Sequence, residues 1–153
     1  MNFKITLALI FMLSLFSCDN AVYKEFYNFP DIQWDKNVTP SFEIDLKEAG
    51  QYDIVFTMRY IEGFQYKDMV GSVLLSDLEN SPVNKNFNFK VIDDSKEYIG
   101  DVAGNIWDIE YTIFADTTLE AGKYTIQAEQ FVNEKTVPFI SDIGIRIVPK
   151  EKK

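Results

Sequence analysis

The alternation of apolar and polar side chains constrains the fold of this chain more than any other feature. After residue 18, apolar residues recur at every second position in one segment after another, whereas helical spacing is weak. Period-two alternation is typical of β-strands that turn one face to a core and the other to water. The segment "QYDIVFTMRY", for example, places on one side the residues Tyr52, Ile54, Phe56, Met58 and Tyr60. The pattern therefore predicts an all-β chain.

We expect about eight strands, joined by short polar turns. Their expected ranges are 22–29, 41–46, 51–60, 69–78, 86–91, 106–114, 123–131 and 142–148. Many short strands with one apolar face each pack most readily as two antiparallel sheets. The sequence therefore predicts an antiparallel β-sandwich, immunoglobulin-like or jelly-roll-like, as a single domain over residues 22–149, followed by a polar tail at 150–153.

The first apolar run differs in composition from the rest of the chain. Residues 5–16, "ITLALIFMLSLF", follow the positively charged Lys4. This is the composition of a secretory signal peptide, and the run is too short to span a bilayer, which takes roughly twenty apolar residues. We therefore expect residues 1–17 to be a signal peptide and residues 18–21 to form a short tether.

The run ends in "LFSC", which contains the only cysteine of the chain, Cys18. An apolar residue three positions before a cysteine and a small residue directly before it are similar to a bacterial lipobox. Cleavage would leave Cys18 as an acylated N-terminus, and two or three acyl chains hold a protein durably on a membrane. The alternative is that Cys18 is an ordinary small apolar residue at the end of a buried helix. We favour lipid attachment at Cys18.

Composition excludes several kinds of function. The formal net charge of −9 disfavours binding to nucleic acid. The chain has no histidine, which excludes serine–histidine and cysteine–histidine catalysis and, with a single cysteine, a zinc site. The acidic residues of 93–101 could gather around calcium, and Asp108 and Glu110 could form a glycosidase pair, although both groups are also ordinary surface residues. We expect no catalytic residue, no metal and no cofactor besides covalent lipid.

Both arginines of the chain, Arg59 and Arg146, lie in the middle of apolar strands. A charge in such a place is costly unless it is paired, and alternation puts both on the polar side of their strands. One interpretation is a cross-strand ion pair with a neighbour such as Asp53 or Glu129. The other is that Arg59 and Arg146 bind a partner protein, because arginine is enriched at interface hot spots.

Aromatic residues crowd the segment 22–34, "VYKEFYNFPDIQW". The simplest interpretation is an edge strand that covers one end of the sandwich. The alternatives are a partner-binding edge that uses Tyr23, Tyr27 and Trp34, or a platform on which these rings and Tyr66 stack sugars.

The order of these features resembles the gliding motility-associated lipoproteins of the GldH family, found in Bacteroidetes. The resemblance rests on the lipobox, the early aromatic strand, "YDIVFTMRY", "LEAGKYTIQAEQ" and "ISDIGIRI". Its most specific parts are Gly122–Tyr124 leading into Gln130, and Ile140–Ile147 with Asp142, Gly144 and Arg146. The chain departs from the expected pattern at "FVNEKTVPF", where a basic stretch with methionine would be typical.

The resemblance implies a membrane-attached periplasmic component of the gliding machinery, or a relative kept for another envelope task in a non-gliding species. Because the sequence also offers no recognisable active site, we expect a non-enzymatic lipoprotein that acts through contacts with other proteins. The resemblance carries over no catalytic residue, and it does not assign the lipoprotein to the inner or the outer membrane. The alternative function is that of a surface or periplasmic lipoprotein that binds glycans.

Overall fold

The computed structural model describes residues 20–150, so the expected signal peptide and Cys18 lie outside the described residues. Between these limits the chain forms strands and no helix. The strands are β1 (Tyr23–Asn28), β2 (Gln33–Asp35), β3 (Ser41–Leu46), β4 (Gly50–Ile61), β5 (Asp68–Asp77), β6 (Val83–Lys90), β7 (Asp101–Ala103), β8 (Ile106–Leu119), β9 (Gly122–Gln130), β10 (Thr136–Pro138) and β11 (Ile140–Pro149). The prediction of an all-β chain is confirmed.

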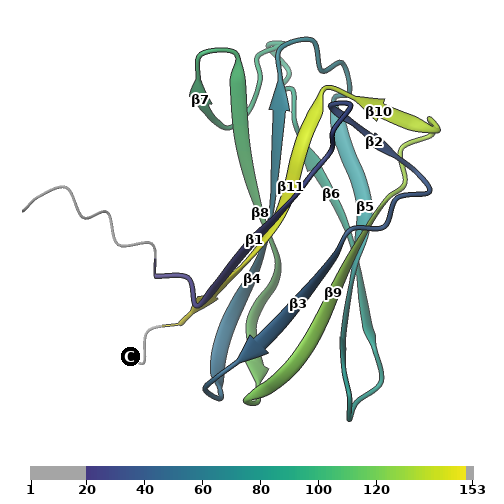
Figure 1. The fold of residues 1–153 in the computed structure, drawn as a ribbon. Coiled ribbons are helices and arrows are strands. Elements are labelled where there is room, and N and C mark those ends of the chain that lie inside the picture. Colours follow the sequence, from purple (N-terminus) through teal and green to yellow (C-terminus); the bar gives the residue numbers. More distant parts are fainter. Residues whose placement is uncertain (1–19, 151–153) are drawn as a thin grey trace, which may run out of the picture.

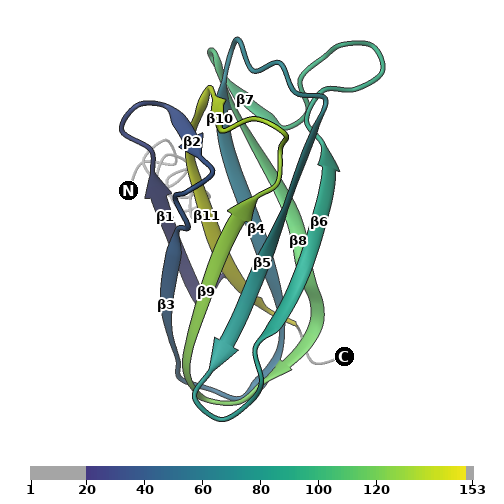
Figure 2. The same ribbon diagram turned by 90° about the vertical axis from the view of Figure 1, so that its right-hand side faces the viewer.

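The strands form two layers, which Figure 1 shows from the side. One sheet has five strands in the order β1-β11-β4-β8-β7, and the other has four strands in the order β3-β9-β5-β6. All their pairings are antiparallel. In Figure 2 the four-stranded sheet lies in front of the five-stranded sheet. The predicted antiparallel β-sandwich is therefore confirmed.

All eight predicted strands are present, and three further strands, β2, β7 and β10, have three residues each. Strands β2 and β10 pair with each other in a separate two-stranded ribbon, while β7 pairs with the start of β8. Figure 1 shows the ribbon and β7 at the same end of the sandwich. A period of two cannot be recognised in three residues, which is why the alternation did not predict these strands.

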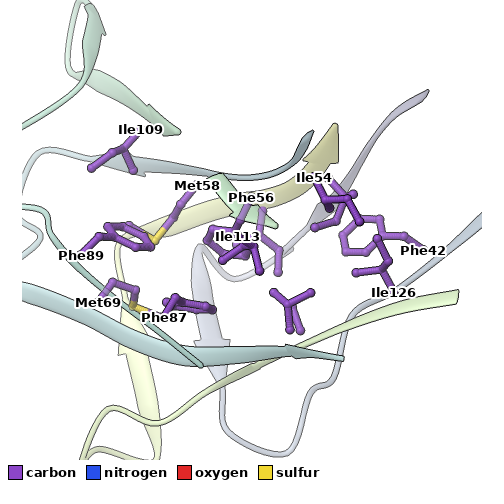
Figure 3. Packing of buried hydrophobic residues seen from close by; sticks show 14 of the residues in the cluster. Phe42, Ile54, Phe56, Met58, Met69, Phe87, Phe89, Ile109, Ile113 and Ile126 are labelled. Carbon is purple, nitrogen blue, oxygen red and sulfur yellow. The ribbon is translucent and has the colours of Figure 1, made fainter. Parts of the chain in front are cut away.

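The core lies between the two sheets, where their apolar faces meet. Phe56 from β4 stacks on Phe87 from β6, with 5.0 Å between ring centroids. Figure 3 shows how Ile113 from β8 and Met69 from β5 fill the space beside these rings. Each large apolar side chain that is fully buried stabilises the fold by about 1.5–3 kcal/mol. Burial of this layer therefore accounts for the packing of the two sheets against each other.

Candidate functional site

Both arginines lie on the outer side of the five-stranded sheet, which faces away from the core. We call this surface the arginine face and define it by Phe26, Thr57, Arg59, Asp108, Glu110, Asp142, Gly144 and Arg146. Antiparallel register places Arg59 between Asp142 on β11 and Asp108 on β8. On the next rung of the same face, Thr57 lies between Gly144 and Glu110, and Phe26 lies beside Gly144. Strand pairing therefore brings four strands together on this surface.

Arg59 forms a two-point ion pair with Asp108. Its Nε and Nη2 atoms donate to the two carboxylate oxygens of Asp108 at 2.7 Å and 2.9 Å. The hydrogen bond to Asp108 raises the pKa of Arg59, and the nearby charge of Asp142 raises it further. The side chain of Arg59 remains 43% exposed, and that of Asp108 remains 48% exposed. A planar guanidinium that is oriented in this way is accessible to a second protein.

Arg146 on β11 forms an ion pair with Glu110 on β8, across the intervening strand β4. Its Nη1 atom donates to Glu110 Oε1 at 2.5 Å, and the arginine side chain is only 17% exposed. The expectation of ion pairs for Arg59 and Arg146 is therefore confirmed, but the partners suggested for them are wrong. Asp53 instead binds Lys150 at 2.8 Å, and Glu129 lies on the four-stranded sheet. Partner choice depends on register, which alternation alone does not provide.

The centre of the arginine face is tightly packed around Gly144. A Cβ atom at Gly144 would lie 2.5 Å from Phe26 Cδ1 and 2.7 Å from Thr57 Oγ1, so only glycine lets these groups approach. Phe26 remains 39% exposed, whereas Thr57 is buried, and among residues 20–150 its hydroxyl has no hydrogen-bond partner. An exposed ring between two arginine pairs is the composition of an interface centre.

The aromatic candidates from the N-terminal segment do not join the arginine face. Tyr23 and Tyr27 lie on β1, the edge strand, on the side opposite to Phe26. Tyr23 donates to Glu25 Oε2 at 2.5 Å, and burial raises the pKa of the Tyr23 hydroxyl. Tyr27 is 37% exposed and packs edge-on against Phe29 at 5.2 Å. Tyr27 therefore remains accessible, whereas Tyr23 is partly buried against the core, and both lie on the other side of the strand from Phe26.

Trp34 corrects the sequence analysis, because it is a core residue. Strand β2 turns the ring inward, where it is fully buried between Phe29 and Phe56 at centroid distances of 5.6 Å and 6.5 Å. Its Nε1 atom donates to the carbonyl of Val38 at 2.9 Å. A partner cannot touch this ring in the folded chain. Tyr66 packs beside Phe64, so the predicted sugar platform of four exposed rings does not form.

Two of the acidic calcium candidates, Asp93 and Asp94, have partners within the fold. Asp93 accepts hydrogen bonds from the backbone amides of Ser95 and Glu97, and Asp94 pairs with Lys67 at 2.8 Å. Over residues 20–150, no group of three or more acidic or cysteine side chains is placed to hold a metal ion. In the same range, no helix is long and apolar enough to cross a membrane.

Sequence reasoning missed Phe26, Thr57 and Asp142 as members of this surface. Alternation gives the side of each strand on which they lie, but their neighbourhood depends on the order of β1, β11 and β4 in the sheet. The same order explains the cluster of Asp142, Gly144 and Arg146 in "ISDIGIRI", because these three residues face outward on β11, which lies between β1 and β4. The motif therefore describes a surface as well as a strand.

Comparison with known proteins identifies the family. The model of the GldH lipoprotein family matches residues 21–147. This range contains β1 to β10 and all of β11 except its last two residues. No curated protein matches the chain. The family match confirms the resemblance found in the sequence. The chain therefore belongs to the GldH lipoprotein family, as a membrane-anchored lipoprotein of the cell envelope that is linked to gliding motility.

Proposed function

We propose that this lipoprotein is a non-enzymatic docking component of the gliding machinery, held on the membrane by lipid at Cys18 and facing the periplasm. Its partner is another envelope protein, which binds the arginine face around Phe26. The observation that carries the proposal is the tightly packed centre of Phe26, Gly144 and Thr57 between the pairs Arg59–Asp108 and Arg146–Glu110. Figure 1 shows no other described strand across this side of the sheet.

The composition of the surface supports binding to a protein rather than to a small molecule. Phenylalanine and arginine are enriched in the centres of protein interfaces, where oriented ion pairs contribute specificity. The ion pairs of the arginine face are already formed before binding, so a partner does not have to order these long side chains. Two of the three carboxylates of the face, Asp108 and Glu110, are engaged by arginine, and Asp142 accepts a hydrogen bond from the hydroxyl of Ser141. These contacts favour a structural role for the carboxylates over acid–base catalysis.

Site-specific crosslinking in a gliding host tests this proposal. A photoreactive phenylalanine replaces Thr112, an exposed residue on the outer side of β8 next to Val55, or, as a control, Asn86 on the outer side of the four-stranded sheet. We expect one envelope protein, identified by mass spectrometry, to be captured from Thr112 and not from Asn86.

Two further variants test whether the arginine face itself is responsible. Arg59→Gln is expected to reduce the crosslinking yield from Thr112 by about tenfold or more, as for an interface hot spot. Lys47→Gln, which removes an exposed charge at the β3–β4 turn, should leave the yield unchanged. Equal capture from Thr112 and Asn86, no capture from either, or full yield in Arg59→Gln would contradict the proposal.

A further inference from the structure

A shallow groove of about 250 Å³ crosses the outer side of the four-stranded sheet, on the opposite side of the sandwich from the arginine face. We call it the amide groove, and it is lined by Ser72, Leu74, Asn84, Gln127, Glu129 and Phe131. These residues come from β5, β6, β9 and the residue after β9. In Figure 2 these strands lie nearest to the viewer.

The register of the sheet explains why the surface is hollow at this place. Leu74 lies between Asn84 and Gln127, and on the next outward rung Ser72 lies between Asn86 and Glu129. Ser72 is small and buried, so the longer side chains of the neighbouring strands rise on both sides of it. The backbone amide of Phe131 donates to the carbonyl of Val70 at 2.8 Å, which holds the backbone of Phe131 at one end of the groove.

The polar side chains of the groove are available to a ligand. Within residues 20–150, the side chains of Asn84, Gln127 and Glu129 make no hydrogen bond to another group of the protein. Each amide offers both a donor and an acceptor, and the carboxylate of Glu129 accepts. Such a mixed set matches a ligand whose groups both donate and accept, as hydroxyl groups do.

The apolar parts of the groove complete this chemistry. Phe131 is 45% exposed, and Leu74 lies on the floor between the polar residues. The face of an aromatic ring carries partial negative charge and attracts the weakly positive C–H groups of an apolar ligand surface. A pyranose ring has both features, since its C–H groups lie on its faces and its hydroxyls at its rim.

The position and charge of the groove disfavour other ligands. Glu129 is the one charged residue of its lining, and the chain has a net charge of −9, so phosphates and other anions are repelled. Peptides that extend a sheet need an edge, whereas this groove crosses β5, which is paired on both sides. We propose that the amide groove binds a neutral saccharide chain. Because the groove is small and open, we expect a Kd of about 0.1–1 mM.

The test uses the full-length lipoprotein in a zwitterionic detergent without a sugar headgroup. The probes are immobilised neutral hexasaccharides of glucose, N-acetylglucosamine, mannose and xylose, in α and β linkages. We expect at least one of them to bind, and Phe131→Ala to weaken its binding by about tenfold through loss of ring stacking. Asn84→Ala, which changes an exposed residue of the opposite wall, should weaken it too.

Phe26→Ala is the matched control, because it removes another exposed phenylalanine from the arginine face. We expect Phe26→Ala to bind the hexasaccharide as the wild type does while losing partner capture at Thr112, so that the two proposals fail or succeed separately. Absence of binding to every probe would overturn the saccharide proposal, as would binding that stays within twofold of wild type in both Phe131→Ala and Asn84→Ala. Circular dichroism of each variant confirms that the sandwich is folded.

Discussion

At the residue scale, Gly144 has a packing role that its place in an apolar strand does not reveal. A Cβ atom there would lie 2.8 Å from the backbone oxygen of Glu25 and 2.5 Å from Phe26. We predict that Gly144→Ala lowers the free energy of unfolding by about 1–3 kcal/mol, because β1 would have to move away from β11. Urea denaturation followed by tryptophan fluorescence measures this change.

Gly50→Ala is a suitable control for this measurement. Its added methyl group would come no closer than 3.3 Å to a neighbour, the ring of Tyr52, which is a side chain and not backbone. We expect a clearly smaller loss of stability than in Gly144→Ala. Equal losses in the two variants would show that the close approach of β1 and β11 is not the cause.

A second prediction at this scale concerns Cys18, which precedes the described residues. With an alkyne analogue of palmitate, we expect the wild-type protein to be labelled and to sediment with membranes. Cys18→Ala should lose the label and move to the soluble fraction, because nothing would then carry the acyl chains. Ser17→Ala keeps a small residue before the cysteine and should retain both label and membrane attachment. Labelled Cys18→Ala protein would place the lipid elsewhere.

At the element scale, ion pairs around Asp53 connect the end of the chain to two strands. Lys150, directly after β11, binds Asp53 on β4 at 2.8 Å and Asp116 on β8 at 3.5 Å. The Asp53 carboxylate also accepts a hydrogen bond from the backbone amide of Asp116 at 2.9 Å. The hydrogen bond from Lys150, followed by that from Asp116, lowers the pKa of Asp53.

A depressed pKa makes this contribution dependent on pH in a defined direction. Asp53 stabilises the fold above its unfolded-state pKa of about 4, and the contribution is lost as the pH falls through the lower folded-state pKa. We predict that Asp53→Asn costs up to about 1 kcal/mol at pH 7, because the ion pair is partly solvated, and that its difference from wild type shrinks below about pH 4. Urea denaturation between pH 3 and pH 7 measures both.

Asp31→Asn serves as a reference, because Asp31 is exposed in the turn after β1 and its side chain makes no hydrogen bond within residues 20–150. We expect its stability to follow that of the wild type over the same pH range. A difference between Asp53→Asn and wild type that stays constant down to pH 3 would refute the role of the carboxylate charge.

The alternation in the sequence predicts the long strands correctly, but it does not predict the short strands or which residues lie opposite each other on adjacent strands. In β3, side chains alternate strictly between exposed and buried, as the pattern "SFEIDL" indicates. Trp34 is a candidate for a partner-binding edge in the sequence because it belongs to an aromatic segment, but its orientation depends on β2 and β10, which are too short to show a period. The partners of Arg59 and Arg146 were wrong for a related reason, since register is a property of two strands and not of one.

At the scale of the whole molecule, the arginine face and the amide groove lie on opposite sides of the core. No residue belongs to both surfaces, since Phe26 lies on β1 of the five-stranded sheet and Phe131 directly follows β9 of the four-stranded sheet. The sequence predicts the two arginines of the first surface as candidate binding residues, but it predicts no binding residue of the second, where Glu129 is expected only as an ion-pair partner. The groove depends on the small Ser72 lying between Asn86 and Glu129, which come from distant parts of the chain.

This separation predicts that changes at the two surfaces are energetically independent. The loss of stability in the double variant Phe26→Ala/Phe131→Ala should equal the sum of the single losses within about 0.5 kcal/mol, as for sites without shared contacts. Urea denaturation of the three variants and the wild type provides the comparison. A larger deviation would show that the two sheets transmit strain through the core.

The pairing of β1 with β11 also determines how the domain carries mechanical load. The chain enters the described fold at residue 20, and β1 has a single neighbour in its sheet, to which it is bonded over six residue pairs. The lipid anchor that we propose at Cys18 would pull on the domain through β1. Tension parallel to the strands shears all six pairs together, whereas tension perpendicular to them peels the pairs apart in sequence. A domain that works under traction is therefore strongest when its partner pulls along the strand axis.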